Sequence, residues 1–176
     1  MLLSCYSFKV AQYFSYQQQQ KCLTKNYIML TVKQINKKEE LIDVSKQEVI
    51  DFLHTHLDRF RDDKVSIGKC IDYAFSDNEA KGGFVLTGHY EGKLVGVVVM
   101  NRTGMEGFIP ENILVYIAVD ASLRGKGIGG QLMKEALDRS EGDVKLHVEY
   151  DNPAKRLYER VGFTSKYAEM RYVKKK

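Results

Sequence analysis

The sequence predicts a mixed α/β domain, in which one central mixed sheet of six to seven strands carries about four helices on its two faces. Two observations support this. Strand-like and helix-like apolar periods alternate along the chain, and antiparallel hairpin signals precede a strand–helix–strand crossover. The expected order is β-α-α-β-β-β-α-β-α-β-β. With 176 residues and 44% hydrophobic content, the chain is long enough for one domain with a proper core.

The first half of the domain is predicted from short periodic runs. Ser45 is a suitable N-cap for the first helix, whose apolar side chains recur at helical spacing. Gly92 lies between two strand-like runs and indicates a tight hairpin. The expected strand, two helices and hairpin are residues 30–35, 45–60, 66–75 and 84–100.

The second half contains the crossover. A nearly continuous apolar run predicts a strand covered on both faces, and a stripe of apolar residues after the next loop predicts a helix. Gly162 is expected to stop the last helix. The expected strand, helix, strand, helix and two short closing strands are residues 113–119, 128–137, 144–150, 154–161, 163–168 and 169–173.

The charge distribution argues against nucleic acid as a partner. The net charge is +4, but residues 1–28 hold three lysines and no acid, and the chain ends in three more lysines at 174–176. The remaining body is therefore slightly acidic. A domain with that balance does not attract a polyanion electrostatically.

Residues 1–28 differ from the rest of the chain and are predicted to be a poorly ordered extension before a domain at 29–176. They contain a glutamine tract at 17–20, and they lack the basic start and longer apolar centre of a secretory signal. They also lack the arginines of a mitochondrial presequence. Met29 is a candidate for the biological start.

The cysteines support neither a disulfide framework nor a zinc site. Cys5, Cys22 and Cys70 are odd in number, are far apart and have no metal-ligand spacing. The four histidines also share no ligand spacing, so no metal is expected. No apolar run approaches the ~20 residues that a membrane span needs. A reducing, cytoplasmic location without a membrane partner is the expectation.

The stretch RGKGIGG at 124–130 has the composition of an anion-binding loop. It lies between a strand-like and a helix-like run, so its backbone N–H groups would meet the positive end of a helix dipole. Glycines let the backbone approach an anion closely, and two cations stand among them. The candidate ligand-binding residues are Arg124, Gly125, Lys126, Gly127, Ile128, Gly129 and Gly130.

Three anions compete for this loop. A nucleoside-triphosphate loop needs a Lys followed by Ser or Thr after its last glycine, and Gln131 and Leu132 stand there instead. A dinucleotide fits G-x-G-x-x-G, with Glu149 about 20 residues further on. However, five residues separate the strand from the first glycine, and little chain follows to complete a doubly wound sheet. The third anion is the pyrophosphate of an acyl carrier, held by R-x-x-G-x-G.

R-x-x-G-x-G after an apolar strand resembles the acetyl-CoA loop of the GNAT N-acetyltransferase superfamily. A second signature follows at the right distance: DNPAKRLYERVGF at 151–163 is similar to the family's N-x-x-A-x-x-x-Y-x-x-x-G-F segment. The small residue, Ala154, lies two positions after Asn152, which is a common variant. The resemblance covers residues 29–173, and it implies a GNAT fold and acetyl-CoA as co-substrate.

The resemblance also implies roles for individual residues. Tyr158 would protonate the leaving thiolate, because a phenol with a pKa near ~10 keeps its proton at neutral pH. Without the resemblance, Tyr158 would be taken as a core residue of its helix stripe. Asn152 would contact the pantetheine, and the backbone groups of Ile117, Ala118 and Val119 would hold the pantetheine arm.

The general base is left open among three residues. Glu149, Glu111 and Tyr116 are candidates, and each has a structural alternative as a solvated strand end or a packing residue. Glu149 is the one that we carry forward. Asp62 and Asp63 lie where this family usually shapes its acceptor pocket, and they could attract a cationic amine.

The resemblance thus implies transfer of an acetyl group to a primary amine by direct attack in a ternary complex. No Cys or Ser stands in a nucleophile motif, so no covalent enzyme intermediate is expected. The acceptor is a small-molecule or peptide amine, and a homodimer is a further possibility. The alternative is a non-catalytic acyl-CoA-binding or regulatory module of the same fold.

Overall fold

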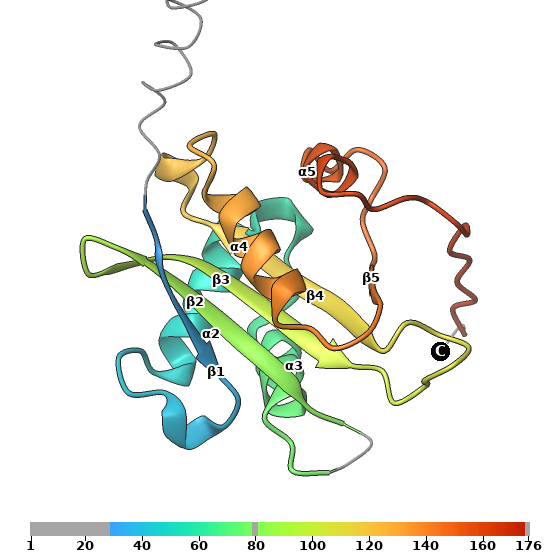
Figure 1. The fold of residues 1–176 in the computed structure, drawn as a ribbon, viewed down its shortest axis with the longest axis horizontal. Helices are drawn as coiled ribbons and strands as arrows, with labels where there is room; N and C mark the ends of the chain where they lie inside the picture. The colour runs from blue at the N-terminus through green and yellow to red at the C-terminus, as the bar shows by residue number, and fades with distance from the viewer. Residues whose placement is uncertain (1–28, 79–80, 175–176) are drawn as a thin grey trace, which may run out of the picture.

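The computed structural model describes residues 29–78 and 81–174, so the expected N-terminal extension lies outside the described residues (Figure 1). Twelve elements follow one another in that part of the chain. They are β1 (Thr31–Ile35), η1 (Lys38–Glu40), α2 (Lys46–His56), η2 (Asp58–Phe60), α3 (Lys64–Ala74), β2 (Gly83–Tyr90), β3 (Lys93–Arg102), β4 (Asn112–Val119), η3 (Ala121–Leu123), α4 (Ile128–Asp138), β5 (Val144–Leu146) and α5 (Lys155–Arg160).

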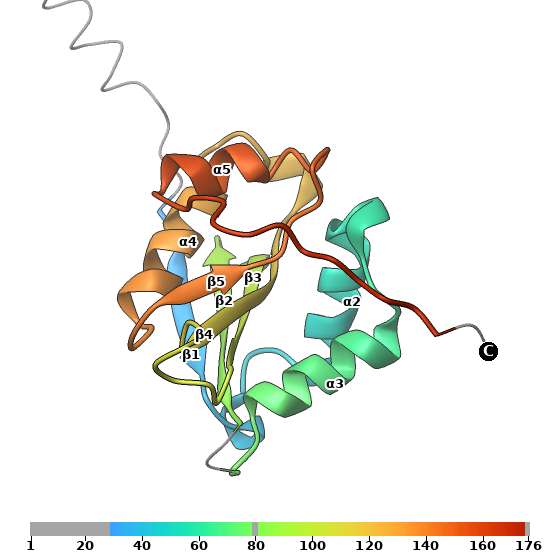
Figure 2. The ribbon, with the colours of Figure 1, turned by 90° about the vertical axis from the view of Figure 1, so that its right-hand side faces the viewer.

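The five strands form one mixed sheet in the order β1-β2-β3-β4-β5. The first four strands are antiparallel neighbours, and β5 runs parallel to β4 after the crossover through α4. Helices α2 and α3 cover one face of the sheet, and α4 and α5 lie on the other side (Figure 2). The mixed α/β fold class predicted from the sequence is confirmed.

Local sequence signals explain the first helices and the hairpin. Ser45 and Glu48 form a reciprocal capping box at the start of α2. Asp63 caps α3, which therefore begins two residues earlier than expected. The hairpin between β2 and β3 turns through Glu91 and Gly92, with φ values of 50° and 74°. Two positive φ values in a two-residue loop match the twist of the flanking strands.

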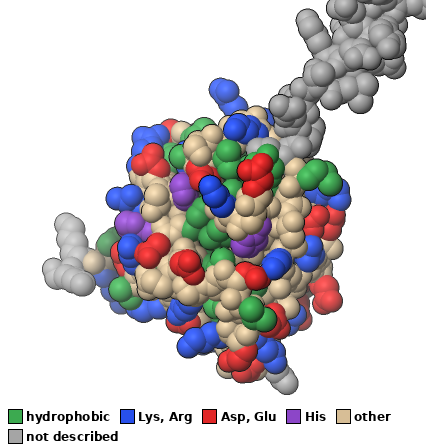
Figure 3. Space-filling view, turned by 90° about the vertical axis from the view of Figure 1, so that its left-hand side faces the viewer, with side chains coloured by type: hydrophobic (Ala, Val, Ile, Leu, Met, Phe, Trp, Pro, Cys, Tyr) green, Lys and Arg blue, Asp and Glu red, His purple; other side chains and the backbone are tan. Residues whose placement is uncertain are grey.

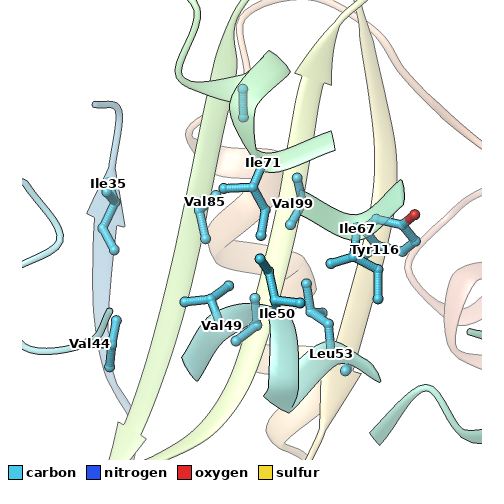
Figure 4. Close-up of a cluster of buried hydrophobic side chains, with 13 residues drawn as sticks. Ile35, Val44, Val49, Ile50, Leu53, Ile67, Ile71, Val85, Val99 and Tyr116 are labelled. Carbon is cyan, nitrogen blue, oxygen red and sulfur yellow. The ribbon is translucent and has the colours of Figure 1, made fainter. Parts of the chain in front are cut away.

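Two apolar clusters hold the layers together. One packs α2 and α3 on the sheet through buried side chains such as Val49, Leu53 and Ile67 (Figure 4). The other packs α4 on the opposite face through Leu132 and Met133, both fully buried. The central strand β3 is buried almost throughout because it contributes to both clusters.

The end of the sheet differs from the sequence-based expectation. The sheet has five strands in the described residues, since β5 ends at Leu146 and residues 163–173 form no strand. In Figure 2 this last segment runs from α5 across the β5 side toward α3. From Tyr167 onward its large side chains are exposed, and a strand needs a partner edge with which to form a ladder. A three-residue β5 offers little such edge.

Acidic and basic side chains are interspersed on the face shown in Figure 3. Elsewhere in the described chain, exposed ion pairs such as Lys64–Asp51, at 2.7 Å, also bring opposite charges together. This face therefore has no extended field of one sign. Within residues 29–78 and 81–174, no helix combines the length and the apolar character needed to cross a bilayer.

Candidate active site

The parallel pairing of β4 and β5 stops after three residues. Asn112, Ile113 and Leu114 pair with Val144, Lys145 and Leu146, and no pairing between the two strands continues beyond them. A bulge in the β3–β4 register follows directly, between the pairs made by Leu114 and Tyr116. The outer edge of the second half of β4 is thus left without a strand partner among the described residues.

The hydrogen-bond pattern shows which backbone groups this open edge offers. The Asp120 N–H donates to the Val95 carbonyl on β3, at 3.0 Å. Because successive residues of a strand alternate, Ala118 also directs its N–H toward β3, whereas Ile117 and Val119 direct theirs outward. Two of the three residues predicted to hold the pantetheine arm therefore present N–H groups at this edge that have no partner within residues 29–78 and 81–174.

The loop after β4 leads into α4 through two left-handed glycines. Gly125 and Gly127 have φ values of 78° and 87°, which favour glycine strongly, and Gly127 is the N-cap of α4. A glycine N-cap supplies no side-chain oxygen to the first turn. The first-turn N–H groups, at Ile128, Gly129 and Gly130, are consequently available to an external acceptor.

Part of the glycine pattern serves packing. A Cβ on Gly129 would lie 3.2 Å from Leu157 Cδ2, and one on Gly130 would lie 4.0 Å from Leu157 Cδ1. Gly129 thus leaves little space for a side chain beside α5, which lies near the start of α4 in Figures 1 and 2, whereas the distance at Gly130 is an ordinary contact. Ile128 is 1% exposed and belongs to the core, so only its backbone can face a ligand.

The two cations of the loop are used differently. Arg124 donates through Nη2 to the His56 carbonyl and through Nε to the Val119 carbonyl, the latter at 3.4 Å. Its guanidinium ties the loop to the ends of α2 and β4. Lys126 is exposed and forms no ion pair within the described part of the chain, so its ammonium group is free to meet an anion.

Tyr158 lies on α5 with its ring packed in the α4-side cluster. It is 8% exposed, and its ring meets Phe163 edge-on at 6.1 Å between centroids. Burial raises the pKa of the Tyr158 phenol to about 12. The hydroxyl has no hydrogen-bond partner among the described residues. Its oxygen is not among the polar side-chain atoms that are both fully buried and without a hydrogen bond.

Asn152 organises the turn that leads into α5. Its side-chain oxygen accepts from the Ala154 N–H at 2.9 Å, and its own N–H donates to the Glu149 carbonyl at 3.0 Å. This turn places α5, and with it Tyr158, against α4. The side-chain NH₂ of Asn152 forms no hydrogen bond within the residues that the structure describes.

The three candidate bases occupy very different surroundings. Glu111 accepts the Asp143 N–H at 2.7 Å, at the opposite end of β4 from the glycine loop. The Tyr116 hydroxyl donates to Asp62 Oδ2 at 2.6 Å on the α2–α3 face, and burial and that bond raise its pKa. Glu149 is exposed just beyond β5 and has no hydrogen bond to its carboxylate in the described chain.

His56 is a site residue that the sequence did not indicate. Its Nδ1 accepts the Ala121 N–H of the loop, at 3.2 Å and across 65 residues of chain. Spacing along a sequence carries no signal for a contact at that separation. Among the described residues, no group of His, Cys, Asp and Glu could hold a metal ion.

Comparison with known proteins assigns this arrangement to a family. Residues 81–165, which include both sequence signatures, match the family described as "Acetyltransferase (GNAT) domain". The chain belongs to the GNAT superfamily. Solved structures of the same fold include the aminoglycoside N-acetyltransferase AAC(6')-Iy in complex with CoA, at 15% identity and a TM-score of 0.58. That likeness covers 83% of this chain and 95% of the other.

Other relatives of this GNAT chain carry different names. The ribosomal-protein-alanine N-acetyltransferase of Brucella melitensis biovar Abortus 2308 is 20% identical, with a TM-score of 0.52 over 84% of this chain and 99% of its own. A transcriptional regulator from Bacillus halodurans C-125 is 18% identical, with a TM-score of 0.56 over 82% and 99%. At such identities the likeness shows the fold alone.

One curated relative is closer in sequence but much longer. The mycothiol acetyltransferase of Brachybacterium faecium is 42% identical in a match of 76 residues that covers 40% of this GNAT chain. The match spans only 23% of the relative's length.

Proposed function

We propose that this GNAT domain transfers an acetyl group from acetyl-CoA to a primary amine by direct attack in a ternary complex. One observation carries the proposal: the unpaired outer edge of β4 leads directly into a glycine-capped helix start. Tyr158 packs in the same cluster as the side chains of Ile117 and Val119. The diphosphate of acetyl-CoA would thus meet the start of α4, its extended arm would meet the β4 edge, and its sulfur would meet Tyr158.

The loop fits the diphosphate of a coenzyme A. The first-turn amides of α4 and the helix dipole favour an anion, and glycine at the N-cap removes both a competing acceptor and a Cβ. Lys126 adds a free cation beside them. The outward N–H groups of Ile117 and Val119 suit the amide carbonyls of an extended arm in the same way that a neighbouring strand would.

Acetyl-CoA would supply an activated acyl group, whose carbonyl oxygen gains negative charge and whose sulfur departs as the amine attacks. A backbone N–H at the β4 edge can stabilise that oxygen, a role worth ~10²–10³ in rate where a donor has been removed. The Tyr158 phenol would give its proton to the sulfur. Its raised pKa of about 12 keeps the proton in place until the thiolate forms.

Glu149 is the proposed base. The amine must lose one proton as its nitrogen bonds the acyl carbon and the carbon–sulfur bond breaks. Glu111 and Tyr116 already use an oxygen each in a hydrogen bond, whereas the Glu149 carboxylate is exposed just beyond β5 and has no hydrogen bond in the described chain. Glu149 also contributes to the raised pKa of Arg171, although the hydrogen bond from Arg171 to Glu169 is the main cause.

The acceptor belongs to the same proposal. Small polyamines, aminoglycosides, amino acids and peptide amines all present a primary amine. Asp62, held by Tyr116 on the α2–α3 face, is a candidate to attract a cationic amine from the side opposite Tyr158. We further propose a cytoplasmic location, supported by the few scattered cysteines, and a homodimer as the assembly.

The experiment is free-thiol release from acetyl-CoA by the full chain, measured with a panel of polyamines, aminoglycosides, amino acids and peptides. At least one amine should accelerate thiol release and gain the mass of an acetyl group. Binding of acetyl-CoA without release for any amine would favour the alternative, a non-catalytic acyl-CoA-binding module.

A further inference from the structure

The last residue of α2 holds the glycine loop twice. His56 Nδ1 accepts the Ala121 N–H at 3.2 Å, and the His56 carbonyl accepts from Arg124 Nη2. Ala121 begins η3, directly after β4, and Arg124 follows η3. One histidine therefore connects the helix on the α2–α3 face with both ends of the short helix that starts the loop.

Each of the two bonds has a physical reason. The C-terminus of α2 leaves carbonyls without intrahelical donors, and a cation is favoured there by the helix dipole. Arg124 satisfies the His56 carbonyl and, through Nε, the Val119 carbonyl at the end of β4. The imidazole is itself oriented by the Phe52 ring, whose centroid lies 4.4 Å away.

We propose that His56 is a positioning residue for the acetyl-CoA loop. This inference rests on the proposed function. His56 does not touch the ligand-binding amides; it fixes the segment from Ala121 to Arg124, so that the flexible glycines after it start from one place. A loop with two left-handed glycines has much conformational freedom to lose on binding, and prior tethering reduces that loss.

The hydrogen bond also fixes the tautomer of the imidazole. Nδ1 accepts the Ala121 N–H through its lone pair, so the ring proton lies on Nε2. The neighbouring Asp120 carboxylate is itself held by the Ser122 N–H and hydroxyl, so the segment after β4 is fixed at two adjacent residues.

Two substitutions separate positioning from general structure. His56→Asn keeps an acceptor at the Nδ1 position, whereas His56→Leu removes the acceptor. The dissociation constant of acetyl-CoA is measured by calorimetry on the full chain at pH 7.5, with melting curves for every variant. His54→Leu, two residues earlier on the same helix, is the matched control.

At pH 7.5 the Leu variant should bind acetyl-CoA about three- to tenfold more weakly, the range expected for one lost hydrogen bond. The Asn variant and the His54 control should match the wild type. Wild-type affinity in His56→Leu, or a loss of affinity in His56→Asn as large as in His56→Leu, would overturn the positioning role alone. If the wild type binds no acetyl-CoA, the proposed function itself fails.

Discussion

Replacing Tyr158 with Phe removes one hydroxyl and leaves the ring that packs against Phe163. The hydroxyl has no hydrogen-bond partner among the described residues, so its loss strands no buried donor or acceptor. The free energy of unfolding should therefore change by no more than about 0.5 kcal/mol. The affinity for acetyl-CoA should also be unchanged, because the loop amides and the β4 edge are untouched.

Turnover should fall far more than stability. General acid catalysis by a positioned side chain typically contributes ~10²–10⁴ in rate, and a Phe cannot donate a proton. Steady-state thiol release with the best amine of the panel gives kcat for wild type and variant. Tyr150→Phe is the matched control, since Tyr150 is 86% exposed and lies outside the packed cluster; its kcat should equal the wild-type value.

The pH dependence offers a second readout from the same residue. The pKa of Tyr158 is raised to about 12 by burial, so the acid keeps its proton throughout the neutral and moderately alkaline range. The stability that this neutral phenol contributes is fully present below its ordinary pKa of 10 and is lost as pH rises toward 12. Tyr158→Phe should lose that alkaline dependence. Unchanged kcat in the variant would remove Tyr158 from the mechanism, and a large drop in melting temperature would make it a core residue.

Three further predictions concern stability and reactivity. Gly96→Val should destabilise the fold by about 1–3 kcal/mol in denaturant titration, because a Cβ there would lie 2.4 Å from Leu132 Cδ1. Gly68→Ala, inside a helix, should be neutral or stabilising, because its Cβ would lie 3.4 Å from Ile50 Cδ1. Equal melting temperatures for the two variants would contradict this. Hydrogen bonds from its own N–H and from the Asp143 N–H lower the pKa of Glu111, so the stability that its carboxylate contributes is present above the ordinary value of 4.5 and is lost as pH falls. Glu111→Gln should therefore make the free energy of unfolding less dependent on acid pH, and an unaltered acid midpoint would refute that role. Burial raises the pKa of Cys70 to about 12, so peptide mapping after alkylation at pH 8 should find it labelled far more slowly in native than in unfolded protein; equal rates would show an accessible thiolate.

Short-range chemistry explains why so much of the fold could be predicted. The capping box at Ser45, the tight turn at Gly92 and the amphipathic stripe of α4 each depend on residues within a few positions. The glycine loop was predicted for the same reason, since left-handed backbone at Gly125 and Gly127 is a local requirement.

The remaining features depend on contacts that a sequence does not display. The Arg124 guanidinium lies on two backbone carbonyls, one of them on a helix that ends 68 residues earlier, and its predicted contact with a phosphate stays a prediction. The two short runs at 163–168 and 169–173 predict closing strands, and a local run of residues cannot supply the partner edge that a strand needs. The proposed roles of Glu149 as base and of Asn152 as a pantetheine contact likewise depend on the direction of the turn after β5, which the sequence does not display.

The most direct measurement is calorimetric titration of the purified, ligand-free full chain with coenzyme A and, separately, with NADH. We predict saturable coenzyme A binding at one site per chain and no heat from NADH, because the amides at the start of α4 and the open β4 edge suit a diphosphate followed by an extended arm. Binding of NADH with no affinity for coenzyme A would contradict it.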